Sequence, residues 1–269
     1  MSDSFLSRVS ASKAILYVLA KEPTAGSVKT RLTPPLSPQQ AATAATAFLE
    51  DTLDMLAQVR ALSGAGRVVE VRVAAAPDSG GSLDRIARLA DRYGVVLEDQ
   101  GEGDLGHRME RLMERGLALP SAPVASGGTS QEGMRPRRVV LLGADSPDLP
   151  ISRLDDAIDA LADHDVVIGP ARDGGYYLIG ANRPVRDLFS PGVAWGGPDV
   201  FRATRDRLNS CERDAAGDRA VSLATLPPWQ DLDDIGDFAA FMARGDSGST
   251  FAPRSRALGL EFRARGLPV

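Results

Sequence analysis

The chain has 269 residues, 43% of them hydrophobic and 25% charged, which is typical of a globular protein with a full core. Its formal net charge of -5 disfavours a broad basic surface for nucleic acid, and its single cysteine excludes an intramolecular disulfide. It lacks an apolar run of the ~20 residues that span a bilayer, and its first dozen residues lack the apolar centre of a secretory signal, so we expect a cytoplasmic protein.

Apolar runs alternate with segments of helical spacing. The first run, AILYVLA at residues 14–20, is typical of a strand buried on both faces. In chain order, the pattern predicts a strand at 14–20, a helix at 39–59, a strand at 67–76, a helix at 82–92, a strand at 95–98, a helix at 106–118, a strand at 138–144, a helix at 152–162, strands at 165–169 and 176–180, a helix at 198–208, a strand at 220–226 and a helix at 235–243.

This alternation predicts a single Rossmann-like α/β domain at residues 14–244, with a mostly parallel mixed sheet covered by helices on both faces. Residues 1–13 and 245–269 have the composition of disordered tails, the second rich in arginine. Residues 121–137, rich in Ser, Gly and Pro, are predicted to be a flexible surface insertion. An exposed apolar helix face could support a homodimer.

Ligands of such sheets bind beyond the carboxyl ends of the strands. The loop after the first strand, KEPTAGSVKTRL at residues 21–32, combines a flexible turn at Gly26 with three cations, Lys21, Lys29 and Arg31. Cations beside a turn that leads into a helix suit a di- or triphosphate, because charge-assisted bonds and helix-end amides act together. The alternative is a solvated basic loop.

The second loop, at residues 100–109, is rich in glycine. Gly103 and Gly106 would let the backbone approach a nucleotide, and Asp104 could accept a hydrogen bond from its base or sugar. Asp104 could equally cap the helix that follows.

Acidic residues in two further loops indicate a metal site. Asp145 follows the strongest apolar strand, where a carboxylate can bind a divalent cation that also bridges phosphates, although a turn aspartate is the alternative. Asp233 or Asp231 could complete this site, whereas Asp234 and Asp237 suit the start of the next helix.

The loop ARDGGYYLIG, at residues 171–180, indicates the side of the site that binds the acceptor substrate. Asp173 could act as a base, and Gly174, Gly175 and Tyr176 would allow close approach of a second substrate; a plain turn is the alternative. Downstream, Trp195 could provide an aromatic platform.

Four motifs occur in order: KEPTAGSVKTRL, GDLGHRM, GADSPDL and DGGYYLIG. Together they resemble the bacterial GT-A-type family of arsenosugar-biosynthesis-like glycosyltransferases, in the nucleotide-diphospho-sugar transferase superfamily. The first loop and the sequence DLD at residues 231–233 are also similar to those of 2-phospho-lactate guanylyltransferase. The resemblance covers roughly residues 15–241. The chain departs from the superfamily at two places. It lacks a full Asp-x-Asp motif at Asp145, and residues 231–237 read DLDDIGD in place of the usual DxDTPxD.

The resemblance implies a GT-A fold and a transferase that uses Mg²⁺ or Mn²⁺ at Asp145 and Asp233. Our leading hypothesis is glycosyl transfer from a nucleotide-diphosphate sugar to a small acceptor, with Lys29 and Arg31 on the diphosphate and Asp173 on the acceptor hydroxyl. The alternatives are nucleotidyl transfer from a nucleoside triphosphate to a phosphorylated or carboxylated molecule, and a non-catalytic nucleotide-binding module.

Overall fold

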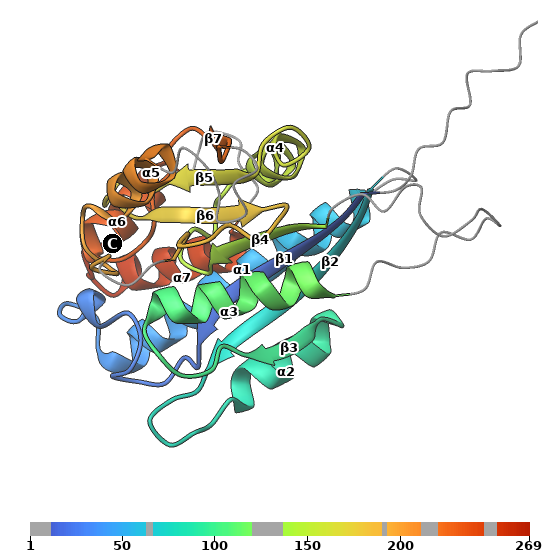
Figure 1. The fold of residues 1–269 in the computed structure, drawn as a ribbon. Coiled ribbons are helices and arrows are strands. Elements are labelled where there is room, and N and C mark those ends of the chain that lie inside the picture. Colours follow the sequence, from blue (N-terminus) through green and yellow to red (C-terminus); the bar gives the residue numbers. More distant parts are fainter. Residues whose placement is uncertain (1–11, 63–66, 120–136, 190–192, 211–219, 245–251) are drawn as a thin grey trace, which may run out of the picture.

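The computed structural model describes residues 12–62, 67–119, 137–189, 193–210, 220–244 and 252–269 (Figure 1). The strands are β1 (Ser12–Lys21), β2 (Arg67–Ala76), β3 (Val96–Asp99), β4 (Arg138–Gly143), β5 (Val166–Pro170), β6 (Tyr176–Ala181) and β7 (Leu223–Thr225). The helices are the 3-10 turn η1 (Thr30–Leu32) and α1 (Pro38–Leu62), α2 (Asp84–Tyr93), α3 (Leu105–Ala118), α4 (Ile151–Ala160), α5 (Val200–Ser210), α6 (Ile235–Ala243) and α7 (Pro253–Ala264).

One seven-stranded sheet runs through the molecule in the order β3-β2-β1-β4-β6-β5-β7. Strand β1 pairs in parallel with β2 and β4, whereas β6 is antiparallel to both of its neighbours, β4 and β5. The prediction of a mostly parallel mixed sheet is therefore confirmed. The register pairs Leu19 near the end of β1 with Gly143 at the end of β4, so the loops after these two strands leave the sheet side by side.

Helices cover both faces of the sheet, because side chains of successive strand residues point to opposite faces. Ala14, Leu16 and Val18 of β1 belong to the core that α1, α2 and α4 cover, whereas Ile15 and Tyr17 face α3 and α5. Figure 1 shows α3 lying along the sheet. None of the helices in the described ranges is long and apolar enough to cross a membrane.

The predicted strands and helices up to residue 244 all appear within a few residues of their expected bounds. The predicted tail is wrong for residues 252–269, which form α7 and a closing turn that pack on α1 and α6. Phe262 and Val269 are buried there against an apolar cluster that includes Phe48 and Phe238. Residues 1–11, 120–136 and 245–251 lie outside the described residues, and they include most of the insertion predicted at 121–137.

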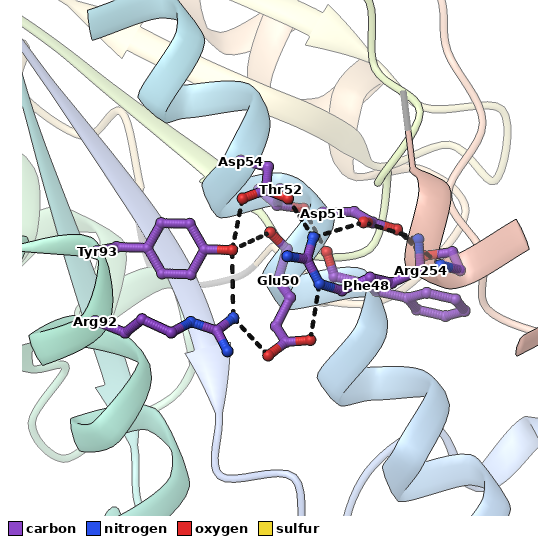
Figure 2. A network of polar contacts seen from close by, with 9 residues as sticks. Phe48, Glu50, Asp51, Thr52, Asp54, Arg92, Tyr93 and Arg254 are labelled. Carbon is purple, nitrogen blue, oxygen red and sulfur yellow. Dashed lines mark hydrogen bonds and ion pairs between the residues drawn. The ribbon is translucent and has the colours of Figure 1, made fainter. Parts of the chain in front are cut away.

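Three acids of α1, of which Asp51 is buried, anchor the start of α7 (Figure 2). The fully buried carboxylate of Asp51 accepts hydrogen bonds from the backbone N–H and the hydroxyl of Ser255, at 2.8 and 2.6 Å, and from the backbone N–H of Arg254 at 3.2 Å. The Arg254 guanidinium pairs with Glu50, Asp51 and Asp54. Asp51 thus caps a helix whose first N–H groups lie 203 and 204 residues further along the chain, and this long-range contact explains why an arginine-rich segment folds against the domain.

Replacing Asp51 with Ala leaves the first N–H groups of α7 and the Ser255 hydroxyl without their buried acceptor. We expect the free energy of unfolding to fall by about 2–3 kcal/mol, with faster proteolysis between α6 and α7. Urea unfolding followed by tryptophan fluorescence, and limited proteolysis, would measure both. Asp91→Ala, at an exposed position on α2, is the control. A D51A protein as stable as this control would show that α7 does not depend on Asp51.

Candidate active site

A cavity of about 380 Å³ opens at the carboxyl ends of β1 and β4. Its charged lining comes from four separate loops: Lys21, Lys29, Arg31, Asp145, Asp173 and Asp233. The structure therefore brings together the cations predicted for phosphate and the acids predicted for metal and acceptor, from positions more than 200 residues apart.

Lys29 lines this cavity and pairs with two of its acids. Its ammonium is 2.7 Å from Oδ1 of Asp145 and 2.9 Å from Oδ1 of Asp233, and only 8% of its side chain is exposed. Burial by itself would lower the pKa of Lys29, but the charges of Asp145 and Asp233 and their hydrogen bonds outweigh it and raise this pKa. The ammonium also lies 6.0 Å from the centre of the Phe48 ring. Lys29 is thus a permanent, buried cation between two carboxylates.

The other cations of the first loop are less constrained. The Arg31 side chain is 70% exposed, and its NH1 is 3.7 Å from Oδ2 of Asp233. The Lys21 ammonium donates to the carbonyl of Ser27 at 3.1 Å, across the turn in which Gly26 adopts a positive φ of 81°. Both side chains are therefore free to turn toward an anionic ligand.

Asp231 and Asp233 have different positions. Asp233 shares the Lys29 ammonium with Asp145, whereas Asp231 is hydrogen-bonded by the hydroxyl of Ser146. Burial, and then the negative charges of Asp145, Asp173 and Asp233, raises the pKa of Asp231 to about 7. Of these two late acids, Asp233 is the one that faces Asp145 across a cation.

Hydrogen bonds behind the cavity hold the two acidic loops together. The backbone N–H of Leu232 donates to the Asp145 carbonyl at 2.8 Å, and that of Asp233 donates to Oδ2 of Asp237 at 3.1 Å. Asp234 and Asp237 lie at the start of α6, as predicted, and form a capping box there.

Contacts of Asp148 with Trp229 and Arg244 were not predicted. Asp148 is buried and accepts from Nε1 of Trp229 at 3.3 Å and from NH2 of Arg244 at 3.1 Å. Local sequence could not indicate these contacts, because both partners lie more than 80 residues from Asp148 along the chain.

A second cavity of about 300 Å³ adjoins the first and shares Lys21 and Asp145 with it. Tyr176, Asp231, Gln100 and Arg108 are among its polar lining residues. The Tyr176 hydroxyl is buried without a hydrogen-bond partner among the described residues, and burial raises its pKa. Gln100 was not predicted as a site residue; its amide donates to the carbonyls of Ala20 and Ala74 and so braces the ends of β1 and β2.

Other predicted site residues serve the local backbone. Asp104 caps α3, its Oδ1 accepting from the backbone N–H of His107 at 3.0 Å. Neither it nor Gly103 is among the residues that line the two cavities. Gly106 packs against Trp195: a Cβ there would lie 2.3 Å from Nε1 of the indole.

The predicted acceptor residues are divided between cavity and core. Trp195 is partly buried, with its ring centre 6.5 Å from that of Tyr176, so its indole packs within an aromatic cluster. Gly174 has a φ of 93°, and a Cβ there would collide with the carbonyl of Pro198. The backbone N–H of Gly175 donates to Oδ1 of Asp173 at 2.9 Å, which fixes that exposed carboxylate at the cavity wall.

The carboxylate oxygens of the site suit a hard divalent cation only if a bound substrate supplies further oxygen ligands. In the part of the chain that the structure describes, no cluster of three or more His, Cys, Asp or Glu side chains could hold a metal ion. Asp145 and Asp233 supply carboxylate oxygens around one shared cation position. Because Mg²⁺ is commonly bound by one or two carboxylates together with substrate phosphates and water, the pair suits a metal that arrives with a phosphate ligand.

A family model described as "Uncharacterized protein conserved in bacteria (DUF2064)" matches residues 56–197. A solved structure from Desulfovibrio desulfuricans G20, provisionally named a nucleotide-diphospho-sugar transferase, is 27% identical over 94% of this chain and 96% of its own, with a TM-score of 0.71. A cytidylyltransferase from Leptospira borgpetersenii is 12% identical over 95% of both chains, with a TM-score of 0.43, a similarity too weak to bear on function. No curated protein matches significantly.

Replacing Asp148 with Ala removes the acceptor for the Trp229 indole and one partner of Arg244. We expect a loss of about 1–3 kcal/mol of stability, because the indole N–H loses a buried partner. We also expect a red-shifted Trp229 emission, because water takes the place of the carboxylate beside the partly buried indole. Trp195 and Trp229 are the two tryptophans of the chain, so the spectra are measured in a Trp195→Phe background. Asp163→Ala, exposed after α4, is the control. Unchanged emission and stability would contradict the bracing role of Asp148.

Proposed function

The chain belongs to the bacterial DUF2064 family, and we propose that it is a metal-dependent transferase that moves a glycosyl group from a nucleotide-diphosphate sugar to a small acceptor. The observation that carries the proposal is the cavity in which Lys29 and Arg31 meet Asp145, Asp233 and Asp173. Support also comes from the Desulfovibrio desulfuricans protein, which is similar over nearly its whole length and is named for nucleotide-diphospho-sugar transfer. The narrower resemblance to arsenosugar-type glycosyltransferases stays a prediction, as do the cytoplasmic location and the homodimer.

The first loop is the donor side of the proposed reaction. Lys29 and Arg31 would bind the diphosphate, and the stabilised diphosphate would be the leaving group. Asp145 and Asp233 would hold Mg²⁺ or Mn²⁺, which when bound supplies positive charge to the phosphate oxygens. The turn at Gly26 and the capped start of α3 at Asp104 remain proposed contacts of the nucleotide.

Asp173 is the proposed acceptor-side group. It lies on the wall of the same cavity and is held by Gly175, so its free oxygen can accept a hydrogen bond from an acceptor hydroxyl. In the reaction, the bond from the anomeric carbon to the diphosphate oxygen breaks and a bond to the acceptor oxygen forms. The hydroxyl proton passes to Asp173, and the diphosphate leaves with the bonding electron pair. Gly174, Gly175 and Tyr176 would border the acceptor, with Trp195 behind them.

Nucleotidyl transfer is the second candidate. It is favoured by the three cations around one cavity, Lys21, Lys29 and Arg31, which would also suit a triphosphate. In that reaction an acceptor oxygen attacks the α-phosphorus and pyrophosphate leaves. A non-catalytic nucleotide-binding module is the least supported reading, because the cavity retains both its cations and its carboxylates.

The donor can be identified by thermal shift with nucleotide sugars and nucleoside triphosphates, each with and without Mn²⁺. We expect metal-dependent stabilisation by one diphosphate sugar that exceeds the stabilisation by the matching triphosphate. Asp145→Asn should abolish the metal-dependent part, because it removes charge at nearly constant size; Asp163→Asn is the matched control. Preference for a triphosphate, with pyrophosphate as product, would replace glycosyl by nucleotidyl transfer. Unchanged metal-dependent binding in D145N would overturn the metal assignment.

Asp173→Asn keeps an oxygen for the Gly175 N–H but cannot accept a proton. We expect kcat to fall by about 10²–10⁴-fold with little change in the KM of the donor, as for loss of a general base. Steady-state kinetics with the donor and acceptor found in the screen would measure both constants. A kcat within a factor of about three of wild type would remove Asp173 from the proton transfer.

A further inference from the structure

We propose that Lys29 is an internal counter-ion that occupies the metal position between Asp145 and Asp233 until a nucleotide phosphate draws it away, so that nucleotide and divalent metal bind cooperatively. The nucleotide half of this inference rests on the proposed function, whereas the competition between Lys29 and metal does not.

The geometry gives Lys29 and a metal the same ligands. The Lys29 ammonium contacts Oδ1 of Asp145 at 2.7 Å and Oδ1 of Asp233 at 2.9 Å. A divalent ion bound by these two oxygens would lie within contact distance of the ammonium, and the two cations would repel one another strongly in a partly desolvated site. Metal binding to both carboxylates therefore requires the lysine to move.

A metal ion alone offers the displaced ammonium nothing in exchange. The Lys29 side chain is nearly buried, beside the Phe48 ring, and the only acceptors of its ammonium within the described residues are the two carboxylates. A buried charge without a partner is unfavourable, so the lysine opposes a metal that arrives by itself.

A phosphate changes both sides of this exchange. It gives the Lys29 ammonium a new anionic acceptor, and it gives the metal the oxygen ligands that two carboxylates do not provide. Each ligand then removes an obstacle to the other, and by thermodynamic linkage each raises the affinity of the other by the same factor.

Arg31 provides a matched comparison, since it faces Asp233 from the same loop. Its side chain is 70% exposed and 3.7 Å from the carboxylate, so it can leave Asp233 for solvent. Loss of Arg31 should therefore weaken nucleotide binding but leave the binding of metal alone nearly unchanged.

Mn²⁺ binding can be measured by electron paramagnetic resonance of the free ion, for wild type, Lys29→Gln and Arg31→Gln. Without nucleotide, we expect wild type and R31Q to bind Mn²⁺ weakly and K29Q to bind it at least tenfold more tightly. Equal Mn²⁺ affinity of K29Q and wild type would overturn the proposal. Tighter Mn²⁺ binding by K29Q would uphold the competition even if no donor or acceptor were ever turned over.

The wild-type protein provides a second test that does not depend on the fold of a variant. Its Mn²⁺ affinity is measured with and without UDP, GDP and CDP, and corrected with protein-free controls for Mn²⁺–nucleotide complexes. We expect at least one diphosphate to raise the affinity tenfold or more. The same Mn²⁺ affinity with and without a diphosphate that itself binds would overturn the cooperative half of the proposal.

Discussion

A buried ammonium must be paired, and the pairing of Lys29 determines how the site is arranged. Of its two partners, Asp145 follows the end of β4 and Asp233 precedes α6. The two carboxylates therefore lie 116 and 204 residues from the lysine along the chain. The parallel register of β1 and β4 makes the first of these contacts available, because both strands end at the same edge of the sheet. The second requires the late loop to return to that edge, where the N–H of Leu232 bonds to the carbonyl of Asp145.

The surrounding hydrogen bonds keep this crowded set of carboxylates in place. Four acids, Asp145, Asp173, Asp231 and Asp233, lie close enough to interact. Burial, and then the charges of the other three acids, raises the pKa of Asp231. Since carboxylates repel one another, the loops that carry them need contacts that do not depend on ligands. The capping box of α6 and the Asp148 contacts supply these, and the acids that make them are not among the residues that line the first cavity.

The sequence was informative where local pattern determines structure. Short apolar runs indicated the strands, and unusual loop compositions at their carboxyl ends indicated where Lys29, Asp145 and Asp173 would meet. Pattern could not indicate α7, because its surface is rich in arginine and its start is capped by Asp51 of α1, 203 residues from Arg254. Nor could it indicate that Lys29 would pair with the two acids expected to hold metal. Both cases depend on contacts between residues distant in sequence, which composition and spacing do not encode.

The charges of the first cavity explain why an anion and a divalent cation suit it together. Three cationic side chains and three carboxylates line it, so the ligand-free cavity is close to neutral at its own surface. A nucleotide diphosphate alone would place its negative charges beside Asp145 and Asp233, and a metal alone would meet Lys29. A diphosphate and a dication together keep the cavity near neutrality and give every displaced charge a partner. In a partly buried site, where unpaired charge is costly, this balance is a physical reason to expect metal dependence without a larger set of protein ligands.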